Sequence, residues 1–446
     1  MKFEIPNLKS SGARLFAGCA FVFLLALGVR ALMLKDSLAE ADQVQWAVTA
    51  NYKHMARLLA EEGVAGFYGR TSKTADPDTL GHPPGYSVLL ALVGVSDARA
   101  RLVQVTADAL AAVLVVLIAA ELLPRGAALL AGLLAALAPQ FAWNSVLLLP
   151  DTLAALPLLA AVYCLVRASR SPHLILFVAA GALVGLSCWL RANALLLAPF
   201  LAAAVFLLEG RGGEGARRGL AVLAGAVLVV APLTLRNAVV FGAFIPVSLG
   251  AGQTLLEGVA DYDRERRFGI PDTDVGIQHQ EAEATGRADY AQTLFGPDAI
   301  ARDRARVSRG LGVILQNPFW FLSVMVRRAG SMLRLERARR VAPPAPPSWA
   351  SYPRLLVSLV QKAFITAVML PLTLLGLLLA FREAPRRRAL ALLVVVPAYY
   401  MCVQSALHTE HRYVLALHYF LFAFAAFAVY SAAQGIKSVS KVRGGL

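Results

Sequence analysis

Ten apolar runs constrain the fold of this chain more than any other feature of its sequence. They cover residues 15–34, 101–121, 126–142, 150–166, 173–190, 192–208, 219–236, 355–380, 389–407 and 413–432. Each is long enough to cross a bilayer as a helix, which takes about 17 to 25 residues. Charged residues make up only 16% of the chain, whereas soluble domains contain about 25%. We therefore expect an all-α polytopic membrane protein with about ten transmembrane helices.

The basic residues indicate how these helices are oriented. The formal net charge is +15, and lysine or arginine recurs in every second gap between runs, at Lys2, Lys9, Arg14, Arg125, Arg167, Arg170, Arg211, Arg217, Arg218, Arg382, Arg386, Arg387, Arg388, Lys437, Lys441 and Arg443. Because these residues concentrate in cytoplasmic loops, both termini are expected in the cytoplasm. No nucleic-acid-binding module is visible, so no nucleic-acid partner is expected.

With this orientation the chain divides into three parts. Residues 1–236 form an N-terminal transmembrane module, which includes a first outer loop at residues 35–100. Residues 237–353 form a second outer region, and residues 354–446 form C-terminal transmembrane helices with a basic cytoplasmic tail. Both outer segments carry amphipathic patterns typical of helices that lie on membrane lipids, at residues 51–62, 298–315 and 318–339.

Three isolated arginines are predicted at the outer ends of transmembrane helices: Arg191, Arg236 and Arg412. A guanidinium group holds phosphate oxygens through paired N–H donors, so three arginines at one depth could converge on an anion. The alternative for each is a pair with a nearby acid, such as Asp151 or Glu410. Asp151 opens an apolar run, where capping of the helix N-terminus is the default expectation.

Acidic residues of the first outer loop are candidates for a general base. Asp42 closely follows the first apolar run, and at the outer membrane surface its carboxylate could accept a proton from an acceptor hydroxyl or amine. Glu40, Asp76 and Asp78 compete for the role. Metal-capable groups occur at His82, His408, Glu410 and His411 without a tight ligand spacing, so no cofactor is certain and a divalent metal ion remains open.

Short motifs spread over nearly the whole chain resemble the membrane glycosyltransferases of the GT-C superfold. The resemblance is to the protein O-mannosyltransferase and aminoarabinose transferase group, glycosyltransferase family 39. The matching pieces are the first outer loop with Asp42, Asn51-Tyr52-Lys53-His54-Met55-Ala56, Gly81-His82-Pro83-Pro84-Gly85-Tyr86, Leu190-Arg191, Leu235-Arg236-Asn237 and Glu410-His411-Arg412-Tyr413.

The resemblance implies an integral protein of the bacterial inner membrane that transfers a sugar from a polyprenyl-phosphate carrier to an acceptor at the periplasmic face, usually with inversion. Under it, Asp42 is the catalytic base and the three arginines hold the carrier phosphate, supported by Glu410, Tyr413, His82 and Asp151. Gln43 departs from the pattern, because a glutamate often follows the first-loop acid. An alternative register places Asn51 at the acidic position.

Two other functions remain compatible with these residues. A transporter or flippase of lipid-linked sugars would use the same arginines without a base, and it predicts inverted repeats and broken paired spans, neither of which is clear in the sequence. A lipid-linked glycan ligase or polymerase would use a lipid-linked oligosaccharide diphosphate as donor instead of a monosaccharide monophosphate. The transferred sugar, the acceptor (lipid, glycan or protein) and the oligomeric state are left open.

Overall fold

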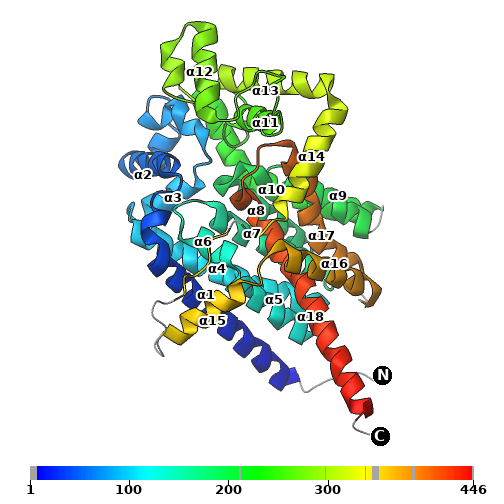
Figure 1. Cartoon of the computed structure of the whole chain (residues 1–446). Helices are drawn as coiled ribbons and strands as arrows, with labels where there is room; N and C mark the ends of the chain where they lie inside the picture. Colours follow the sequence, from blue (N-terminus) through cyan, green and yellow to red (C-terminus); the bar gives the residue numbers. More distant parts are fainter. Residues whose placement is uncertain are drawn as a thin grey trace.

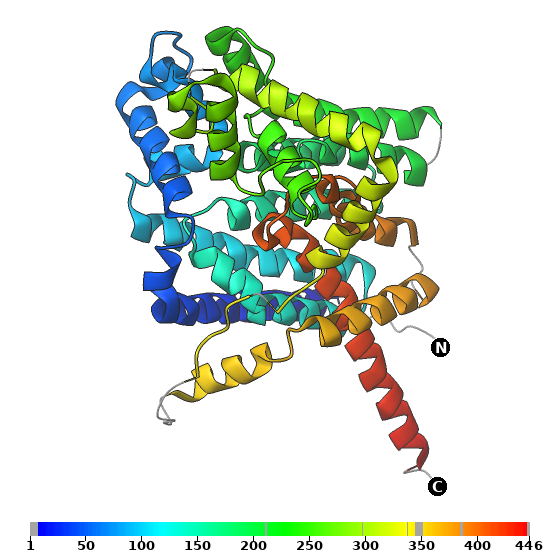
Figure 2. The same ribbon diagram turned by 45° about the horizontal axis from the view of Figure 1, so that its top comes forward.

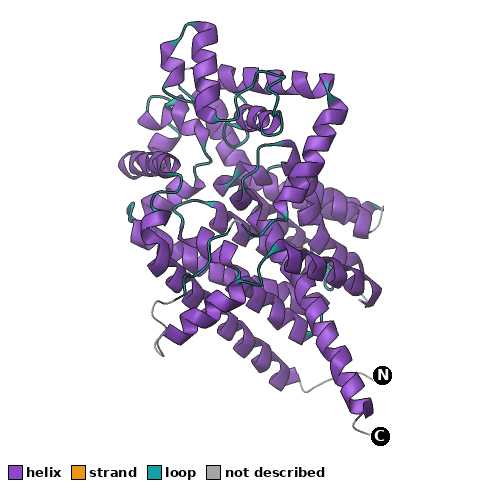
Figure 3. Ribbon diagram, viewed as in Figure 1, coloured by secondary structure: helices purple, strands orange, loops and turns teal. Residues whose placement is uncertain are grey.

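The computed structural model describes residues 8–209, 212–296, 298–336, 338–343, 351–383 and 387–443. Within these ranges the chain folds into helices and loops, without a strand (Figure 3). Lys2, Arg211 and Arg386, which entered the orientation argument, lie outside them. The expectation of an all-α polytopic membrane protein is confirmed.

The apolar runs of the sequence all fall on helices. Six helices in the described part of the chain are long and apolar enough to span a membrane: α1 (Leu8–Ala41), α4 (Asp97–Leu122), α7 (Asp151–Ala168), α10 (Gly213–Phe241), α17 (Arg387–Cys402) and α18 (Leu415–Arg443). Two bent pairs raise this number to eight, and the shorter α8 (Leu174–Leu190) and α9 (Leu197–Glu209) are also apolar. The protein is therefore an integral membrane protein.

The two bent pairs are α5 (Arg125–Leu137) with α6 (Pro139–Val146), and α15 (Tyr352–Gln361) with α16 (Thr366–Glu383). The first pair bends by 48°. Proline explains this bend, because Pro139 disfavours a helical conformation at Ala138, which has ψ of 121°. The second pair bends by 69°.

The outer segments form further helices, and both termini lie at the end of the molecule opposite α12 and α13 (Figure 1). The first outer loop contains α2 (Trp46–Phe67), the short η1 (Lys73–Ala75) and η2 (Pro77–Gly81), and α3 (Gly85–Leu92). The second contains α11 (Ala251–Ala260), α12 (Asp274–Thr285), η4 (Ala288–Ala291), α13 (Ala299–Gln316) and α14 (Pro318–Met332). The amphipathic patterns correctly predicted helices at α2, α13 and α14, although α14 ends before Arg339. No helix was predicted at α11 or α12.

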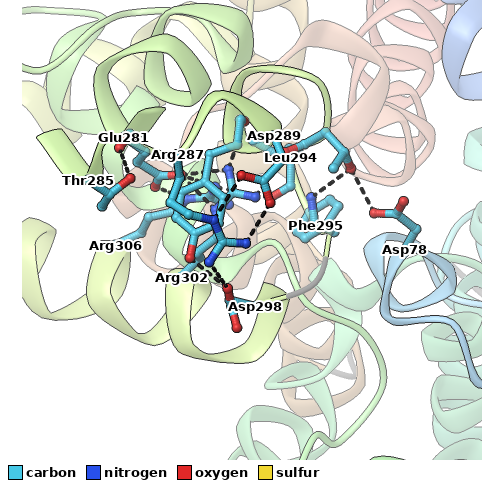
Figure 4. Close-up of polar contacts among 12 residues, drawn as sticks. Asp78, Glu281, Thr285, Arg287, Asp289, Leu294, Phe295, Asp298, Arg302 and Arg306 are labelled. Carbon is cyan, nitrogen blue, oxygen red and sulfur yellow. Dashed lines mark hydrogen bonds and ion pairs between the residues drawn. The ribbon is translucent and has the colours of Figure 1, made fainter. Parts of the chain in front are cut away.

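A polar cluster fastens the second outer segment to the first (Figure 4). Arg302 and Arg306 of α13 both bind Glu281 of α12, with Nε–Oε distances of 2.9 and 2.6 Å. Beside them, the Thr293 hydroxyl donates a hydrogen bond of 2.7 Å to Asp78 in the first outer loop. The Phe295 ring covers Gly81 so closely that a Cβ there would lie 2.6 Å from it. The residue before His82 is therefore held between both outer segments.

A buried ion pair ties four helices together inside the membrane region. Arg30 of α1 lies 2.6 Å (Nε–Oδ2) from Asp108 of α4, and the Tyr419 hydroxyl of α18 donates to the same carboxylate. Arg30 also donates to the Ala135 carbonyl of α5 at 3.2 Å. All of these side chains are buried, so each charge is paired where water cannot solvate it.

The segment after α14 reaches back to the outer end of α1. Arg339 forms an ion pair with Glu40, and the Ala342 amide donates to Asp36 at 3.2 Å. Arg354 of α15 binds Asp36 as well, and α15 lies beside α1 in both views (Figures 1 and 2). The helix that precedes Asp42 is thus anchored by residues about three hundred positions later in the chain.

Candidate active site

Arg191 and Asp151 form the first half of the site. Helix α8 ends at Leu190, and the extended backbone of Arg191 (φ −146°, ψ 119°) turns its side chain toward the start of α7. There Nε lies 2.8 Å from Asp151 Oδ1, and Nη2 binds the same oxygen. The Asp151 side chain is only 3% exposed. As the first residue of α7 it also lies at the positive end of a helix dipole.

Arg412 forms the second half, in the η7 turn (His411–Val414) that leads into α18. Its Nε and Nη2 each lie 2.8 Å from an oxygen of Glu410, and Nη1 lies 3.5 Å from Asp151 Oδ2. The Tyr413 ring lies against both guanidinium groups, 4.3 Å from that of Arg191 and 4.8 Å from that of Arg412. We call Asp151, Arg191, Glu410, Arg412 and Tyr413 the paired-arginine site.

Hydrogen bonds from side chains to backbone carbonyls connect the two halves. The Asn193 side-chain Nδ2 donates to the Tyr413 carbonyl at 3.0 Å, and the Tyr399 hydroxyl of α17 donates to the Asn193 backbone carbonyl at 2.6 Å. A small cavity with room for about one water molecule lies between the halves, lined by Asp151, Ala154, Ala155, Leu158, Arg191, Asn193, Tyr400, Arg412, Tyr413, Leu415 and Ala416.

His82 and Tyr52 lie next to the paired-arginine site. The His82 ring stacks on Tyr52 with centroids 4.8 Å apart. Burial, together with the positive charges of Arg191 and Arg412, lowers the pKa of His82 to about 4. The imidazole is therefore neutral at physiological pH and adds no charge. The Tyr52 hydroxyl is buried and has no hydrogen-bond partner among the described residues, which is costly unless a bound group satisfies it.

Arg236 lies apart from the other two arginines. It donates to the Phe67 carbonyl at 3.0 Å and to the Thr74 carbonyl at 2.6 Å. Its guanidinium group also stacks against Phe67 and Phe241, at 4.5 and 4.8 Å from their ring centres. These contacts attach α10 to the first outer loop, so the structure brings together two of the three arginines that the sequence singled out.

Asp42 lies at a second cavity of about 280 Å³, the outer cavity. It is lined by Ala41, Asp42, Trp46, Thr49, Ala50, Lys53, Arg57, Asp97 and Leu148. Arg101 binds Asp42 Oδ1 and also donates to the Val146 carbonyl at 2.9 Å. Asp42 is about half exposed, and no described residue donates a hydrogen bond to its Oδ2 atom. This oxygen is available to accept a proton.

The competing acids of the first outer loop are engaged elsewhere. Glu40 pairs with Arg339, Asp76 caps η2 by accepting from the Asp78 amide at 3.0 Å, and Asp78 accepts from Thr293. Of the four acids, Asp42 is the one that lines the outer cavity, which is large enough for a substrate group.

Sequence reasoning did not single out Tyr52 and Arg101 as site residues. Tyr52 belongs to a motif that was noted, but its unpartnered hydroxyl is a property of tertiary packing. Arg101 begins an apolar run one helical turn after Asp97, where a basic residue is commonly explained by the membrane boundary. An arginine at the outer end of a span was the available signal, the same one that pointed to Arg191.

Charge balance indicates what the paired-arginine site can bind. Two arginines face two carboxylates, so an incoming anion must replace one carboxylate as a partner. Glu410 is the candidate for exchange, because its side chain is 35% exposed whereas that of Asp151 is 3% exposed. Burial raises the pKa of Glu410, but hydrogen bonds and the charge of Arg412 outweigh burial and lower it overall. No group of three His, Cys, Asp or Glu residues suited to a metal ion occurs in the described ranges.

Comparisons with known proteins agree with this architecture. A family described as dolichyl-phosphate-mannose-protein mannosyltransferase matches residues 82–235, about a third of the chain, including His82, Asp151 and Arg191. No curated protein sequence matches the chain.

Solved structures of an archaeal oligosaccharyltransferase from Archaeoglobus fulgidus share the fold. The enzyme AglB in complex with an inhibitory peptide and a dolichol-phosphate has a TM-score of 0.53 and 16% identity, over 98% of this chain and 52% of that chain. An apo form has a TM-score of 0.54 and 15% identity, over 97% of this chain and 52% of that chain. The present chain thus spans about half the length of these proteins.

The chain is therefore an all-α membrane protein that shares its fold with the archaeal oligosaccharyltransferase. The chain has the GT-C fold, as its sequence motifs predicted.

Proposed function

We propose that this protein is a glycosyltransferase that moves a sugar from a polyprenyl-phosphate carrier to an acceptor at the outer face of the bacterial inner membrane. The observation that carries the proposal is the convergence of Arg191 and Arg412 on Asp151 and Tyr413. The GT-C fold and the family match support it. In addition, the archaeal relative forms a complex with a dolichol-phosphate, which is a lipid phosphate of the same chemical class.

The proposed reaction is a single displacement with inversion at the anomeric carbon. Asp42 accepts the proton of the acceptor hydroxyl or amine as that atom bonds to the anomeric carbon. The bond from this carbon to the phosphate oxygen breaks, and the electron pair leaves with the polyprenyl phosphate. Arg191 and Arg412 stabilise the negative charge that develops on the phosphate, which lowers the barrier more than it favours the bound donor.

Supporting roles follow from the geometry. Glu410 orients Arg412 before the donor binds, and Asp151 and Tyr413 fix the spacing of the two guanidinium groups. The neutral His82 ring supports Tyr52 beside them. We propose that Arg236, contrary to a role in phosphate binding, positions the first outer loop through its contacts with Phe67 and Thr74.

The orientation of the protein is part of the proposal. Arginine and lysine in alternate gaps place the termini in the cytoplasm, and the paired-arginine site and the outer cavity then face the periplasm. A donor there needs no nucleotide, because the sugar is already activated by its link to phosphate.

Carrier binding tests the phosphate site. In Arg191→Gln and Arg412→Gln, we expect the Kd for a short-chain polyprenyl phosphate to rise about 10- to 100-fold, the effect of losing a charge-assisted hydrogen bond. Arg170→Gln, at the Glu121 pair near the other end of α7, is the matched control and should bind as the wild type does. Wild-type affinity in both site variants would contradict the phosphate site.

Sugar transfer tests the base. We expect Asp42→Asn to retain carrier binding and lose transfer, as read by mass spectrometry of surface lipids, glycans and proteins, whereas Glu61→Gln, at an exposed acid of the same loop, should retain transfer. Unchanged transfer in Asp42→Asn would reject the base assignment. A wild-type protein that carries the lipid-linked sugar across the membrane without transferring it would instead be a transporter.

A further inference from the structure

The outer cavity has a lining that the proposed reaction does not by itself require. One stripe of α2 faces it, namely Trp46, Thr49, Ala50, Lys53 and Arg57. These positions recur at the three- and four-residue spacing of one helical face. The opposite face of α2, with Tyr52, Met55 and Leu58, is buried in the protein. The fold thus turns an aromatic, a hydroxyl and two cations toward the side on which Asp42 lies.

The charges of the cavity do not balance. Lys53 is paired with Asp97 at 2.7 Å, and Asp42 is paired with Arg101. Arg57 lies one helical turn beyond Lys53, is exposed, and has no ion-pair partner among the described residues. Arg101 does not line the cavity, but it neutralises Asp42 from behind, and Lys53 neutralises Asp97, so the charge of Arg57 is left for a ligand to pair with.

The shape and chemistry of the lining suit a sugar. The cavity of about 280 Å³ has room for a pyranose ring, and the small side chain of Ala50 is part of its lining. Trp46 is 68% exposed, so its indole face can pack against the C–H groups of a pyranose. The Lys53 ammonium and the Asp97 carboxylate offer a donor and acceptors to neighbouring hydroxyl groups. The free oxygen of Asp42 would face one such hydroxyl.

We propose that the outer cavity binds the acceptor, and that this acceptor is a saccharide carrying a phosphate or carboxylate group that pairs with Arg57. The inference rests on the proposed function, because it assigns the acceptor of the same reaction. Trp46 and Lys53 hold the sugar ring, Arg57 holds the anionic substituent, and Asp42 receives the proton of the reacting hydroxyl.

Binding of small probes tests the proposal without a donor. The full-length protein in phosphatidylcholine nanodiscs is titrated with glucose 6-phosphate, glucuronate, neutral glucose and inorganic phosphate. Saturation-transfer NMR reports binding of the three sugars, and the phosphorus NMR signal reports binding of inorganic phosphate. We expect the two anionic sugars to bind at least about tenfold more tightly than glucose or inorganic phosphate, the gain from one charge-assisted contact added to a sugar site.

Three variants locate the site. Arg57→Gln removes the unpaired charge and Ala50→Trp fills the cavity, so each should weaken glucose 6-phosphate binding about tenfold or more. Arg70→Gln removes an exposed arginine of the same outer loop and should have no effect. Each variant must still bind polyprenyl phosphate as the wild type does, which shows that the protein is folded.

Several results would overturn the proposal. Equal binding of glucose and glucose 6-phosphate would reject an anionic acceptor, and equal binding of inorganic phosphate would reject a saccharide. Absent binding, or unchanged binding in Arg57→Gln and Ala50→Trp, would reject the site. Displacement of glucose 6-phosphate by phosphatidylglycerol added to the nanodiscs would identify a lipid-headgroup site instead. Failure of the proposed function would appear separately, as absent carrier binding or as unchanged binding in the Arg191 and Arg412 variants.

Discussion

At the scale of single residues, two neighbouring tyrosines show how packing decides a role that the sequence cannot. The Tyr52 and Tyr86 rings meet edge to face at 5.0 Å, and both are buried. The Tyr86 hydroxyl donates to Gln104 at 2.8 Å, whereas the Tyr52 hydroxyl has no partner within the described residues. The first hydroxyl stabilises the fold, and the second is left for a ligand or an ordered water.

Removal of the two hydroxyl groups should therefore have different effects on the stability of the protein. Tyr86→Phe leaves the Gln104 carbonyl oxygen without its donor, so we expect the free energy of unfolding to fall by about 1 to 3 kcal/mol. Tyr52→Phe removes an unsatisfied donor, so the stability of the unliganded protein should stay the same or rise. Thermal unfolding of both variants in detergent measures the difference. An equal loss of stability in the two variants would show that Tyr52 has a structural partner.

The depth of a residue could be predicted from the sequence, but its lateral position could not. Arg191, Arg236 and Arg412 were all predicted at the outer ends of spans. Depth follows from the boundary of an apolar run, whereas convergence depends on which helices are neighbours. The structure brings α7, α8 and the turn before α18 together at Asp151, and it places Arg236 against Phe67 instead.

At the scale of elements, α11 positions the turn that carries Arg412. Helix α11 packs so closely against the segment before this turn that a Cβ on Gly258 would lie 2.7 Å from the His408 amide nitrogen. The His408 ring pairs with Asp261 at 2.9 Å, and Arg328 of α14 donates to the Ser405 carbonyl at 2.6 Å. Composition predicts the membrane helices well because they are apolar throughout. It did not predict α11, which is short, carries both polar and apolar side chains, and is held in place by these tertiary contacts.

Glu257 makes this element sensitive to pH. Burial raises the pKa of Glu257 to about 7 from an ordinary value near 4.5. A raised pKa in the folded state stabilises the protein below the unfolded value, and this stability is lost as pH rises from about 4.5 to 7. Since glutamine does not ionise, we expect the melting temperature of Glu257→Gln to fall less between pH 5 and 8 than that of the wild type.

The comparison needs a matched control. Glu283→Gln changes an exposed acid of α12, and its melting profile should follow that of the wild type. If Glu257→Gln also follows the wild-type profile, burial of Glu257 does not destabilise the protein at neutral pH.

At the scale of the whole molecule, the ten apolar runs gave the correct membrane class and located the helices. The apolar runs do not reveal the bends of α5 with α6 and of α15 with α16, which reduce the number of long straight spans, although Pro139 is a sequence signal for the first bend. The apolar runs also do not show the contacts between distant segments, such as Thr293 with Asp78. Hydrophobicity specifies the environment of a segment, whereas neighbours are specified by side-chain fit.

The orientation can be tested by labelling from outside the cell. Cys402 is exposed, so we would first replace it with alanine. A cysteine introduced at Asp272 should then react with a membrane-impermeant maleimide in intact cells, whereas one at Gly213 should react only after lysis. The reverse pattern would place both proposed sites in the cytoplasm and contradict a polyprenyl-phosphate donor at the outer face.

The return of the chain from Arg339 and Arg354 to Glu40 and Asp36 has a consequence for biosynthesis. The first outer loop leaves the ribosome long before the residues that anchor its helix. Until the last third of the protein is inserted, the end of α1 lacks these anchors, and Asp42 is held by Arg101 alone. A nascent or truncated chain would also lack Arg412, so the proposed activity would appear only when synthesis is nearly finished.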